Sequence, residues 1–368
     1  MNGNIKKLRD LGQSLWYDNM QRRLLTGGRM KEMIAEGWVQ GVTSNPSIFQ
    51  KAIVDSDDYN HALKKMAAEG LNADAIYLGL VEEDIRTTAD LLRGVYEQTD
   101  GRDGYVSLEV SPKWARNAKE TIAEALSLVA RLDRPNVMIK VPGTPEGLEA
   151  IRELTRQGVS INVTLLFSMK QYEAIAQAYL SGLEARLEDG QRIHKIASVA
   201  SFFVSRVDTL IDRRLDESHP DRAPALKGKA AIANSKLVYQ RGLEIFSGAR
   251  WEAIEANGGR AQRLLWASTS TKNPAYSDTL YVDELIGPNT VNTLPPSTLD
   301  AFADHGHPAL SLTRDLDAAR AHIAAIEALG IDMNEVGETL QNAGVDAFRT
   351  SMETLMQVID TRRKALVR

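Results

Sequence analysis

The sequence predicts an α/β protein of the (β/α)8 TIM-barrel class with additional C-terminal helices. Short apolar segments alternate eight times with longer segments of helical period, a pattern typical of parallel strands joined by crossover helices. Eight repeats in 368 residues suit one closed barrel. The alternative is an open, doubly wound sheet, but no G-x-G-x-x-G follows a strand and no G-x-x-x-x-G-K-[ST] is present.

The N-terminal quarter is expected to hold two short strands. A helix is predicted over residues 4–13, and residues 15–18 form a first strand that ends in the carboxylate of Asp18. Residues 19–37 carry apolar side chains at helical spacing, which predicts one helix ending at Gly37. Residues 39–44 form the second strand, and Asn45 with Pro46 is the turn that opens the next helix.

The middle of the chain has the clearest alternation. Strands are predicted within residues 105–111, 137–141 and 160–167. Helices are predicted over residues 59–68, 73–98, 114–132, 145–157 and 169–187.

The C-terminal part completes the count of eight. The sixth strand and its exit loop lie within residues 195–206, the seventh begins the segment RLLWASTSTKN, and the eighth lies within residues 289–296. Helices are expected around Leu210 and over residues 230–246, and the pattern is helical from Leu310 onward. We expect one barrel domain over residues 1–368, with residues ~310–368 as appended C-terminal helices.

Composition excludes several classes of function. Hydrophobic residues make up 43% and charged residues 25%, which is ordinary for a globular protein. The net charge of −5 favours neither a nucleic-acid nor a membrane partner. The absence of cysteine excludes disulfides and thiolate chemistry. No segment has the length of a membrane span or the pattern of a secretory signal, so a cytoplasmic location is expected.

The chain is organised around Lys140, which lies inside the apolar segment VMIKV. Side chains alternate along a strand, so Met138 and Lys140 share one face. Burial removes hydration from a lysine and favours its neutral amine, which can attack a carbonyl and form a Schiff base. The alternative is that Lys140 ends an edge strand and extends to water.

Polar side chains on three strands point to a shared site. Glu109, Asn162 and Thr164 occupy polar faces near strand C-termini, and barrel enzymes place their sites at that rim. Glu109 and Thr164 can transfer protons through a bound water, and Asp18 can serve as a second acid–base group. The alternatives are a buried salt bridge from Glu109 to Lys140, a satisfied interior network for Asn162 and Thr164, and a helix N-cap for Asp18.

The remaining candidate residues would bind substrate. Asn45 and Asn162 can hydrogen-bond substrate hydroxyls, although Asn45 is also explained as a turn residue. Ser201 and Phe203 share a face of the sixth strand. A phosphate at the rim would be held by Arg206, Ser268 and Lys272. The alternative for Arg206 is pairing with Asp208 or Asp212.

The chain resembles the transaldolase family of Schiff-base enzymes. The matching segments are VTSNPS, SLEVS, MIKVPGTPEG, INVTLLFS and SFFVSRVD, with looser matches in LWYD, WASTSTKN and TLPPS. They extend from the first strand to the eighth. The resemblance implies that Lys140 forms the Schiff base and that Asp18 takes a proton from the C4 hydroxyl. It also implies that Glu109 and Thr164 hold the catalytic water.

The resemblance also implies the substrates and the remaining roles. Asn45, Asn162 and Ser201 would bind a dihydroxyacetone unit, and Arg206 would bind phosphate. The family's second arginine has no match in WASTSTKN, where Lys272 or nearby serines would replace it. The implied reaction, in the pentose phosphate pathway, transfers dihydroxyacetone from sedoheptulose 7-phosphate or fructose 6-phosphate to glyceraldehyde 3-phosphate or erythrose 4-phosphate. No metal or other cofactor is required, and the protein is expected to be a monomer or homodimer.

Two rival functions remain open. A fructose 6-phosphate aldolase shares the fold and the lysine but releases free dihydroxyacetone, using a tyrosine and a glutamine to govern water. Phe203 and Glu109 stand at those positions here, which favours transfer. A non-catalytic barrel that binds phosphosugars is the other rival, and it predicts no covalent adduct.

Overall fold

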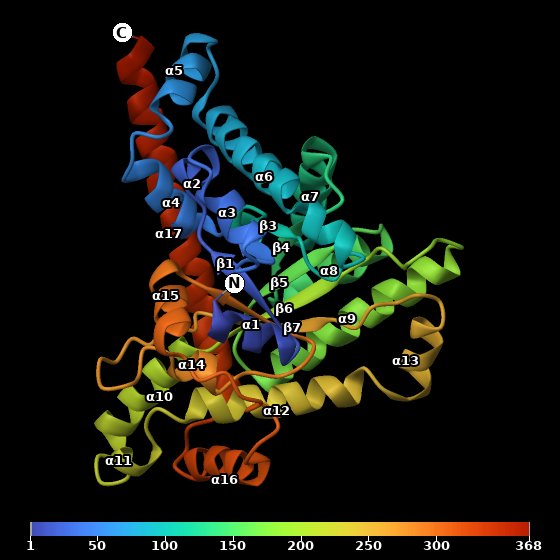
Figure 1. The fold of residues 1–368 in the computed structure, drawn as a ribbon, viewed down its shortest axis with the longest axis vertical. Helices are drawn as coiled ribbons and strands as arrows, with labels where there is room; N and C mark the ends of the chain where they lie inside the picture. The colour runs from blue at the N-terminus through green and yellow to red at the C-terminus, as the bar shows by residue number, and fades with distance from the viewer. Residues whose placement is uncertain (1, 368) are drawn as a thin grey trace.

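Eight parallel strands close into a barrel in the order β1 to β8, with β8 paired to β1. The computed structural model describes residues 2–367 (Figure 1). All eight predicted strands are confirmed. The strands are β1 (Gln13–Asp18), β2 (Gly41–Thr43), β3 (Val106–Glu109), β4 (Val137–Pro142), β5 (Ile161–Leu166), β6 (Ser198–Phe203), β7 (Arg263–Ala267) and β8 (Thr290–Leu294).

Helices surround the barrel, as the alternating pattern predicts. They are α1 (Gly3–Asp10), α2 (Arg22–Thr26), α3 (Arg29–Ala35), α4 (Pro46–Val54), α5 (Asn60–Ala68), α6 (Ala73–Gln98), η1 (Pro112–Trp114), α7 (Ala118–Leu132), α8 (Pro145–Arg156), α9 (Met169–Glu188), α10 (Ser205–Ser218), α11 (Ala223–Leu226), α12 (Ala230–Ile245), α13 (Gly248–Glu255), α14 (Leu280–Asp283), α15 (Pro296–His305), α16 (Leu316–Glu327) and α17 (Met333–Val367).

Two predicted helices are each divided in the structure. The helix expected over residues 19–37 is split into α2 and α3 because Gly28 adopts a left-handed conformation with φ of 83°. The helix expected over residues 114–132 becomes η1 and α7. The second begins after Asn117, whose side chain accepts a hydrogen bond from the amide of Glu120 as an N-cap.

The N-terminal end of the barrel is filled by side chains. Trp16 on β1 is fully buried and lies opposite Gly41 on β2. A Cβ atom at Gly41 would come within 2.5 Å of the Trp16 indole, so only glycine fits. The indole Nε1 donates to Asp103 at 3.0 Å, and Asp103 also forms a 3.1 Å ion pair with Arg263. The part of this end around Trp16 and Asp103 is therefore packed and internally bonded.

The long helix α17 returns to the barrel from the end of the chain. It contacts α4, α5, α6, η1, α9, α10 and β5 (Figure 1, red). The side chain of Gln341 donates to the carbonyl oxygens of Gly143 and Leu165, at 2.9 and 3.0 Å. The Gly143 carbonyl directly follows β4, and the Leu165 carbonyl belongs to β5. Gln341 therefore attaches α17 to the C-terminal ends of these two strands.

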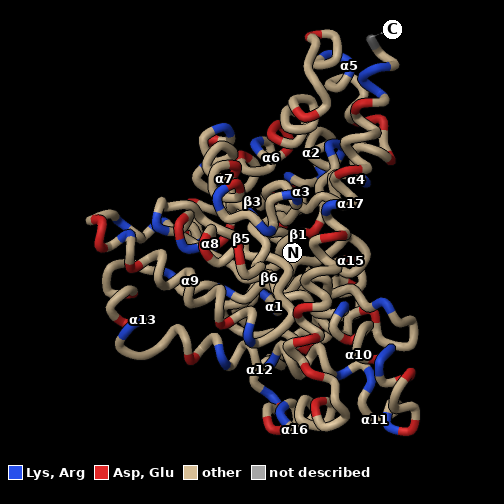
Figure 2. Tube along the Cα trace, turned by 180° about the vertical axis from the view of Figure 1, so that it is seen from behind, with Lys and Arg blue, Asp and Glu red and all other residues tan. Residues whose placement is uncertain are grey.

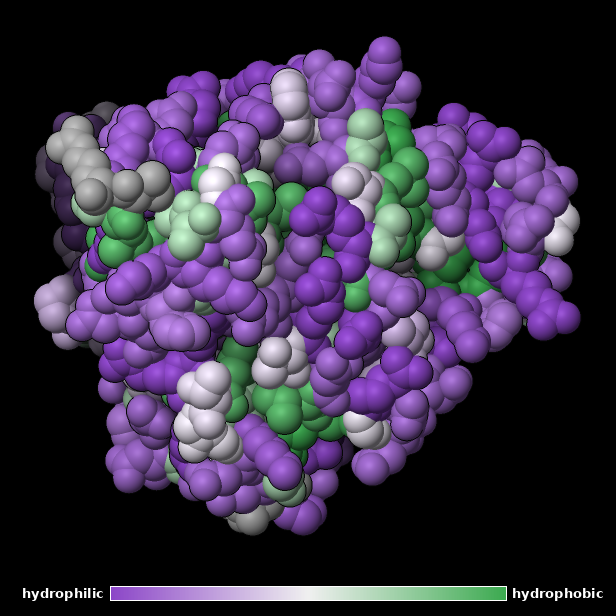
Figure 3. Space-filling model, turned by 90° about the horizontal axis from the view of Figure 1, so that it is seen from above, coloured by the Kyte–Doolittle hydropathy of each residue, from purple (hydrophilic) through white to green (hydrophobic). Residues whose placement is uncertain are grey.

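The surface is mixed in charge and mostly hydrophilic. Acidic and basic residues are interspersed along the trace in Figure 2. The face in Figure 3 is largely hydrophilic, with apolar residues gathered in strips between polar ones. Within residues 2–367, no helix is both long and apolar enough to cross a membrane.

Candidate active site

Three of the predicted site residues form one row across neighbouring strands. Glu109 on β3 pairs in register with Lys140 on β4, which pairs with Asn162 on β5. All three side chains are buried. Side chains in register on adjacent parallel strands lie on the same side of the sheet, so the row brings a carboxylate, an amine and an amide together inside the barrel.

Lys140 is enclosed rather than exposed at an edge. The barrel is closed, and the residue is only 4% exposed, so the edge-strand alternative is wrong. Its Nζ donates to the Ser44 carbonyl at 3.2 Å and lies 3.4 Å from Glu109 Oε2. The Phe348 ring of α17 covers it, with the ring centroid 5.9 Å from Nζ.

Glu109 has an unusual environment for a carboxyl group. Burial raises its pKa to about 7, against the opposing effect of the Lys140 ammonium. The contact with Lys140 has ion-pair distance but not hydrogen-bond geometry, and neither carboxylate oxygen has a hydrogen-bond partner among the described residues. The two groups thus lie at ion-pair distance, as the salt-bridge alternative from the sequence expects.

Asp18 lies at the end of β1, near Lys140. Burial raises its pKa, while the positive charge of Lys140 and a hydrogen bond from Thr43 oppose the rise. The Thr43 hydroxyl donates to Asp18 Oδ1 at 2.6 Å. The next helix, α2, begins after Gln21, so Asp18 is not its N-cap. The Asp18 carboxyl group is therefore held in a fixed orientation near the Lys140 amine.

A short chain of hydrogen bonds orients the amide of Asn162. Its Nδ2 donates to the Ser107 hydroxyl at 3.0 Å, and its Oδ1 accepts from the Ser201 hydroxyl at 2.7 Å. The interior-network alternative is thus true of Asn162. Thr164, one pleat further along β5, is different because its buried Oγ1 has no partner among residues 2–367.

Arg206 lies in the first turn of α10 at the barrel rim. Asp208 and Asp212, its expected alternative partners, instead accept hydrogen bonds from backbone amides and tyrosine hydroxyls. The guanidinium lies over the Phe203 ring at 5.3 Å, and burial lowers its pKa. In the described part of the chain it has no carboxylate partner, which leaves it available to an anion.

A second cation lies beside Arg206. Burial lowers the pKa of Lys272, and the positive charge of Arg206 lowers it further. Its Nζ donates to the Ser270 hydroxyl at 2.7 Å. Ser268 has a left-handed backbone with φ of 56°, and its hydroxyl lies 3.0 Å from that of Ser205. Two cations and several hydroxyls thus gather at one side of the rim.

Asn45 has a structural role of its own. Its Oδ1 accepts from the amide of Ile48 at 3.0 Å and caps α4. The interpretation of Asn45 as a turn residue is therefore correct for its side-chain oxygen, which caps α4. The side-chain amide nitrogen remains free to donate, because no protein acceptor for it is found in the described structure.

Sequence reasoning missed several residues that complete the site. Thr43 contacts Asp18, and the Ser44 carbonyl contacts Lys140. Both residues lie within the segment VTSNPS, so the sequence signal for them was present in that segment. Phe348 and Gln341 come from α17, some two hundred positions after the lysine strand. Nothing in the strand pattern links that helix to the site.

The assembled groups suit covalent carbonyl chemistry. They comprise a buried amine, two carboxyls with raised pKa and a pair of rim cations. Among the described residues no group of three or more His, Cys, Asp or Glu side chains could hold a metal ion.

Comparison with known proteins gives one consistent family. The family model described as Transaldolase/Fructose-6-phosphate aldolase matches residues 15–359. A transaldolase of Thermobifida fusca is 48% identical over 361 residues, which cover 97% of each chain. Transaldolase 1 of Streptomyces avermitilis is 48% identical over 359 residues, 97% of this chain and 95% of the relative. A transaldolase of Frankia alni is 46% identical over 360 residues, 98% and 97% of the two chains.

Proposed function

Because the chain belongs to the transaldolase/fructose-6-phosphate aldolase family, we propose that Lys140 forms the Schiff base through which it transfers a dihydroxyacetone unit. The relatives named transaldolase match this chain almost from end to end, so the chain is an enzyme with transaldolase activity. The single observation that carries the assignment to Lys140 is its position. Its amine is enclosed inside a barrel, within 3.4 Å of a carboxyl whose pKa is about 7.

The first chemical step is imine formation. The neutral Lys140 amine attacks C2 of a ketose and forms a carbinolamine, and the hydroxyl on C2 then leaves as water. The departing hydroxyl needs a proton, which protonated Glu109 supplies through a water held with Thr164. This arrangement is supported by three buried oxygen atoms, two on Glu109 and one on Thr164, that have no protein partner in the described structure.

The second step is cleavage of the C3–C4 bond. Ionised Asp18 accepts the proton of the C4 hydroxyl, the bond breaks, and its electron pair passes through C3 to the iminium nitrogen. The aldehyde product leaves and an enamine remains on Lys140. An acceptor aldehyde then reacts with this enamine by the reverse of the cleavage step. This role is supported by the hydrogen bond from Thr43, which orients the Asp18 carboxylate, and by the nearby Lys140 charge.

The substrates are phosphorylated ketoses and aldoses. Arg206 and Lys272 would bind the phosphate, supported by the free guanidinium and by the proximity of the two cations. The donors are sedoheptulose 7-phosphate and fructose 6-phosphate, and the acceptors are glyceraldehyde 3-phosphate and erythrose 4-phosphate. The proposal includes a single barrel domain, a cytoplasmic location and a monomeric or homodimeric state.

Borohydride trapping tests the proposal directly. Reduction in the presence of fructose 6-phosphate, followed by peptide mapping, should place the adduct on Lys140. Lys140→Ala should form no adduct and lose turnover, with an unchanged circular dichroism spectrum. An adduct on a different lysine, or none on the wild-type protein, would contradict the mechanism.

A further inference from the structure

A second cavity lies at the end of the barrel opposite Lys140. It is bordered by Met138, Ser198 and Arg263, each at or near the start of its strand. Its volume is about 480 Å³, within the range of small-molecule sites. The proposed catalytic groups sit near the other ends of the strands, so this cavity has no part in the transfer reaction.

One side of the cavity is apolar and aromatic. Trp251 of α13 and Phe246, which follows α12, form an edge-to-face pair with ring centroids 5.2 Å apart. Leu243 of α12 also lines the cavity and is 45% exposed. A fixed aromatic pair beside an exposed leucine gives a flat ligand ring a surface to cover.

Two buried polar atoms at the cavity lack partners in the described structure. Gln262 is only 4% exposed; its Nε2 donates to Ser198 at 2.8 Å, but its Oε1 accepts nothing. Arg263 Nε donates to nothing, although both its terminal nitrogens are bonded. An unpaired buried polar group is costly. Because the Arg263 guanidinium is already paired with Asp103 at 3.1 Å, the ligand group that this side of the cavity calls for is a donor to Gln262 Oε1.

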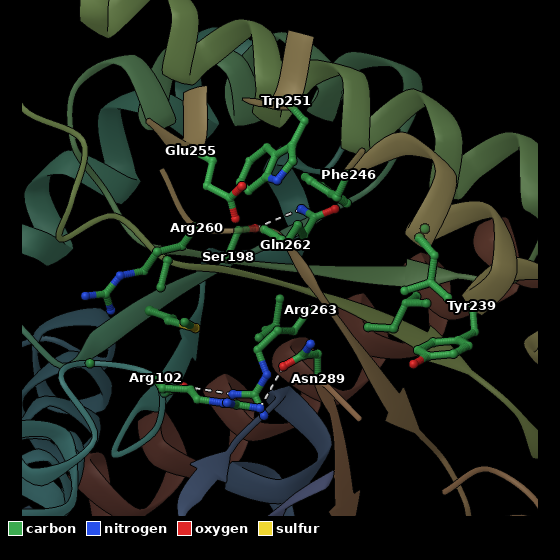
Figure 4. A pocket seen from close by; sticks show the side chains of 18 of the residues that line it. Arg102, Ser198, Tyr239, Phe246, Trp251, Glu255, Arg260, Gln262, Arg263 and Asn289 are labelled. Atoms are coloured by element: carbon green, nitrogen blue, oxygen red, sulfur yellow. Dashed lines mark hydrogen bonds between the residues drawn. The ribbon is translucent and has the colours of Figure 1, made fainter. Parts of the chain in front are cut away.

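Positive charge borders the other side. The exposed Arg102 donates to Asn289 at 2.8 Å and has no carboxylate partner in the described chain. Arg260 pairs at 3.2 Å with Asp100, which is fully exposed, so that pair competes weakly with a ligand anion. Figure 4 shows Trp251, Phe246 and Gln262 across the cavity from Arg102 and Arg263, with Arg260 at one side.

We propose that this cavity binds a mononucleotide-like ligand, a flat nitrogen heterocycle that carries an anionic group. The heterocycle lies against Trp251 and Phe246 and donates to Gln262 Oε1. The anion lies at the opposite side, where Arg102 donates to it. Glu255, which lines the cavity, provides an acceptor for a ligand hydroxyl or amine.

Isothermal titration calorimetry of the full chain tests the site with AMP, adenosine and inorganic phosphate as probes. AMP should bind with a Kd below about 1 mM, and both fragments should bind more weakly. Gln262→Leu and Arg102→Ala should each weaken AMP binding about tenfold. Both variants should keep wild-type transaldolase kinetics, because neither residue reaches the catalytic groups.

Two arginine variants serve as controls. Arg134→Ala removes an arginine that pairs with Asp90 and does not line the cavity, so AMP binding should not change. Arg206→Ala should also leave AMP binding unchanged. Absence of AMP binding, equal binding of adenosine and AMP, or a loss in Arg206→Ala without a loss in Arg102→Ala would overturn the proposal.

Discussion

In the proposed mechanism, Glu109 serves two steps of the same reaction. A carboxyl group with a pKa of about 7 is protonated in part of the molecules and ionised in the rest at neutral pH. It can therefore give a proton during dehydration of the carbinolamine and take one during hydrolysis of the imine. Burial is the larger cause of this pKa, and the barrel provides that burial through β3 and β4.

The protonation of Glu109 predicts a pH dependence. Below about pH 7 the carboxyl carries the proton that the leaving hydroxyl needs, and above it the proton is absent. The single-turnover rate of imine formation should therefore fall as pH rises through about 7. In Glu109→Gln this dependence should vanish, and the rate should drop about a hundredfold. Rapid-quench trapping with borohydride measures the rate. An identical pH profile in Glu109→Gln would contradict the role.

The side chain at position 203 is expected to determine whether free dihydroxyacetone is released. Its ring has no hydroxyl and packs between Phe167, with centroids 5.2 Å apart, and the Arg206 guanidinium. Phe203→Tyr adds a hydroxyl able to activate water near the enamine. We expect free dihydroxyacetone to accumulate from fructose 6-phosphate without an acceptor, several-fold faster than in wild type. Phe203→Leu is the matched control and should not release more dihydroxyacetone. Equal release by Phe203→Tyr and wild type would contradict this role.

The strands were predictable because their apolar residues and turns are local signals. The row of Glu109, Lys140 and Asn162 followed from the same alternation, since residues near strand ends share a rim once the barrel is closed. The division of residues 19–37 was missed because two glycines interrupt a pattern that otherwise keeps helical period. The place of α17 could not be predicted, because amphipathic period identifies a helix but not the surface that it covers.

The attachment of α17 predicts a stability effect. Gln341 satisfies two buried carbonyls at the ends of β4 and β5. Gln341→Met keeps the side-chain length but leaves both carbonyls unpaired, which should cost about 2–3 kcal/mol of unfolding free energy. Urea denaturation measures the change.

The surface residue Glu338 on the same helix provides the control. It forms an exposed 3.7 Å pair with Lys170, so Glu338→Gln should change the unfolding free energy by less than about 0.5 kcal/mol. Equal midpoints for Gln341→Met and wild type would show that the two Gln341 hydrogen bonds do not stabilise the attachment of α17.

The distribution of charge over the whole molecule sets the conditions for substrate capture. The chain carries a net charge of −5 and interspersed charges (Figure 2). The overall field therefore repels a phosphorylated sugar, and in the proposed mechanism the local pair of Arg206 and Lys272 must overcome that repulsion. Such steering operates over about one Debye length, roughly 10 Å at 0.1 M salt.

This balance predicts a dependence on ionic strength. The kcat/KM for erythrose 4-phosphate should fall as salt increases, because screening weakens the attraction to Arg206 and Lys272 more than it relieves the diffuse repulsion. Lys272→Ala removes the more exposed of the two cations, so its kcat/KM should be lower and should depend less on salt, with kcat nearly unchanged. Unphosphorylated erythrose is the matched substrate and should show no such dependence. Parallel salt profiles for the two aldoses would place phosphate recognition elsewhere on the rim.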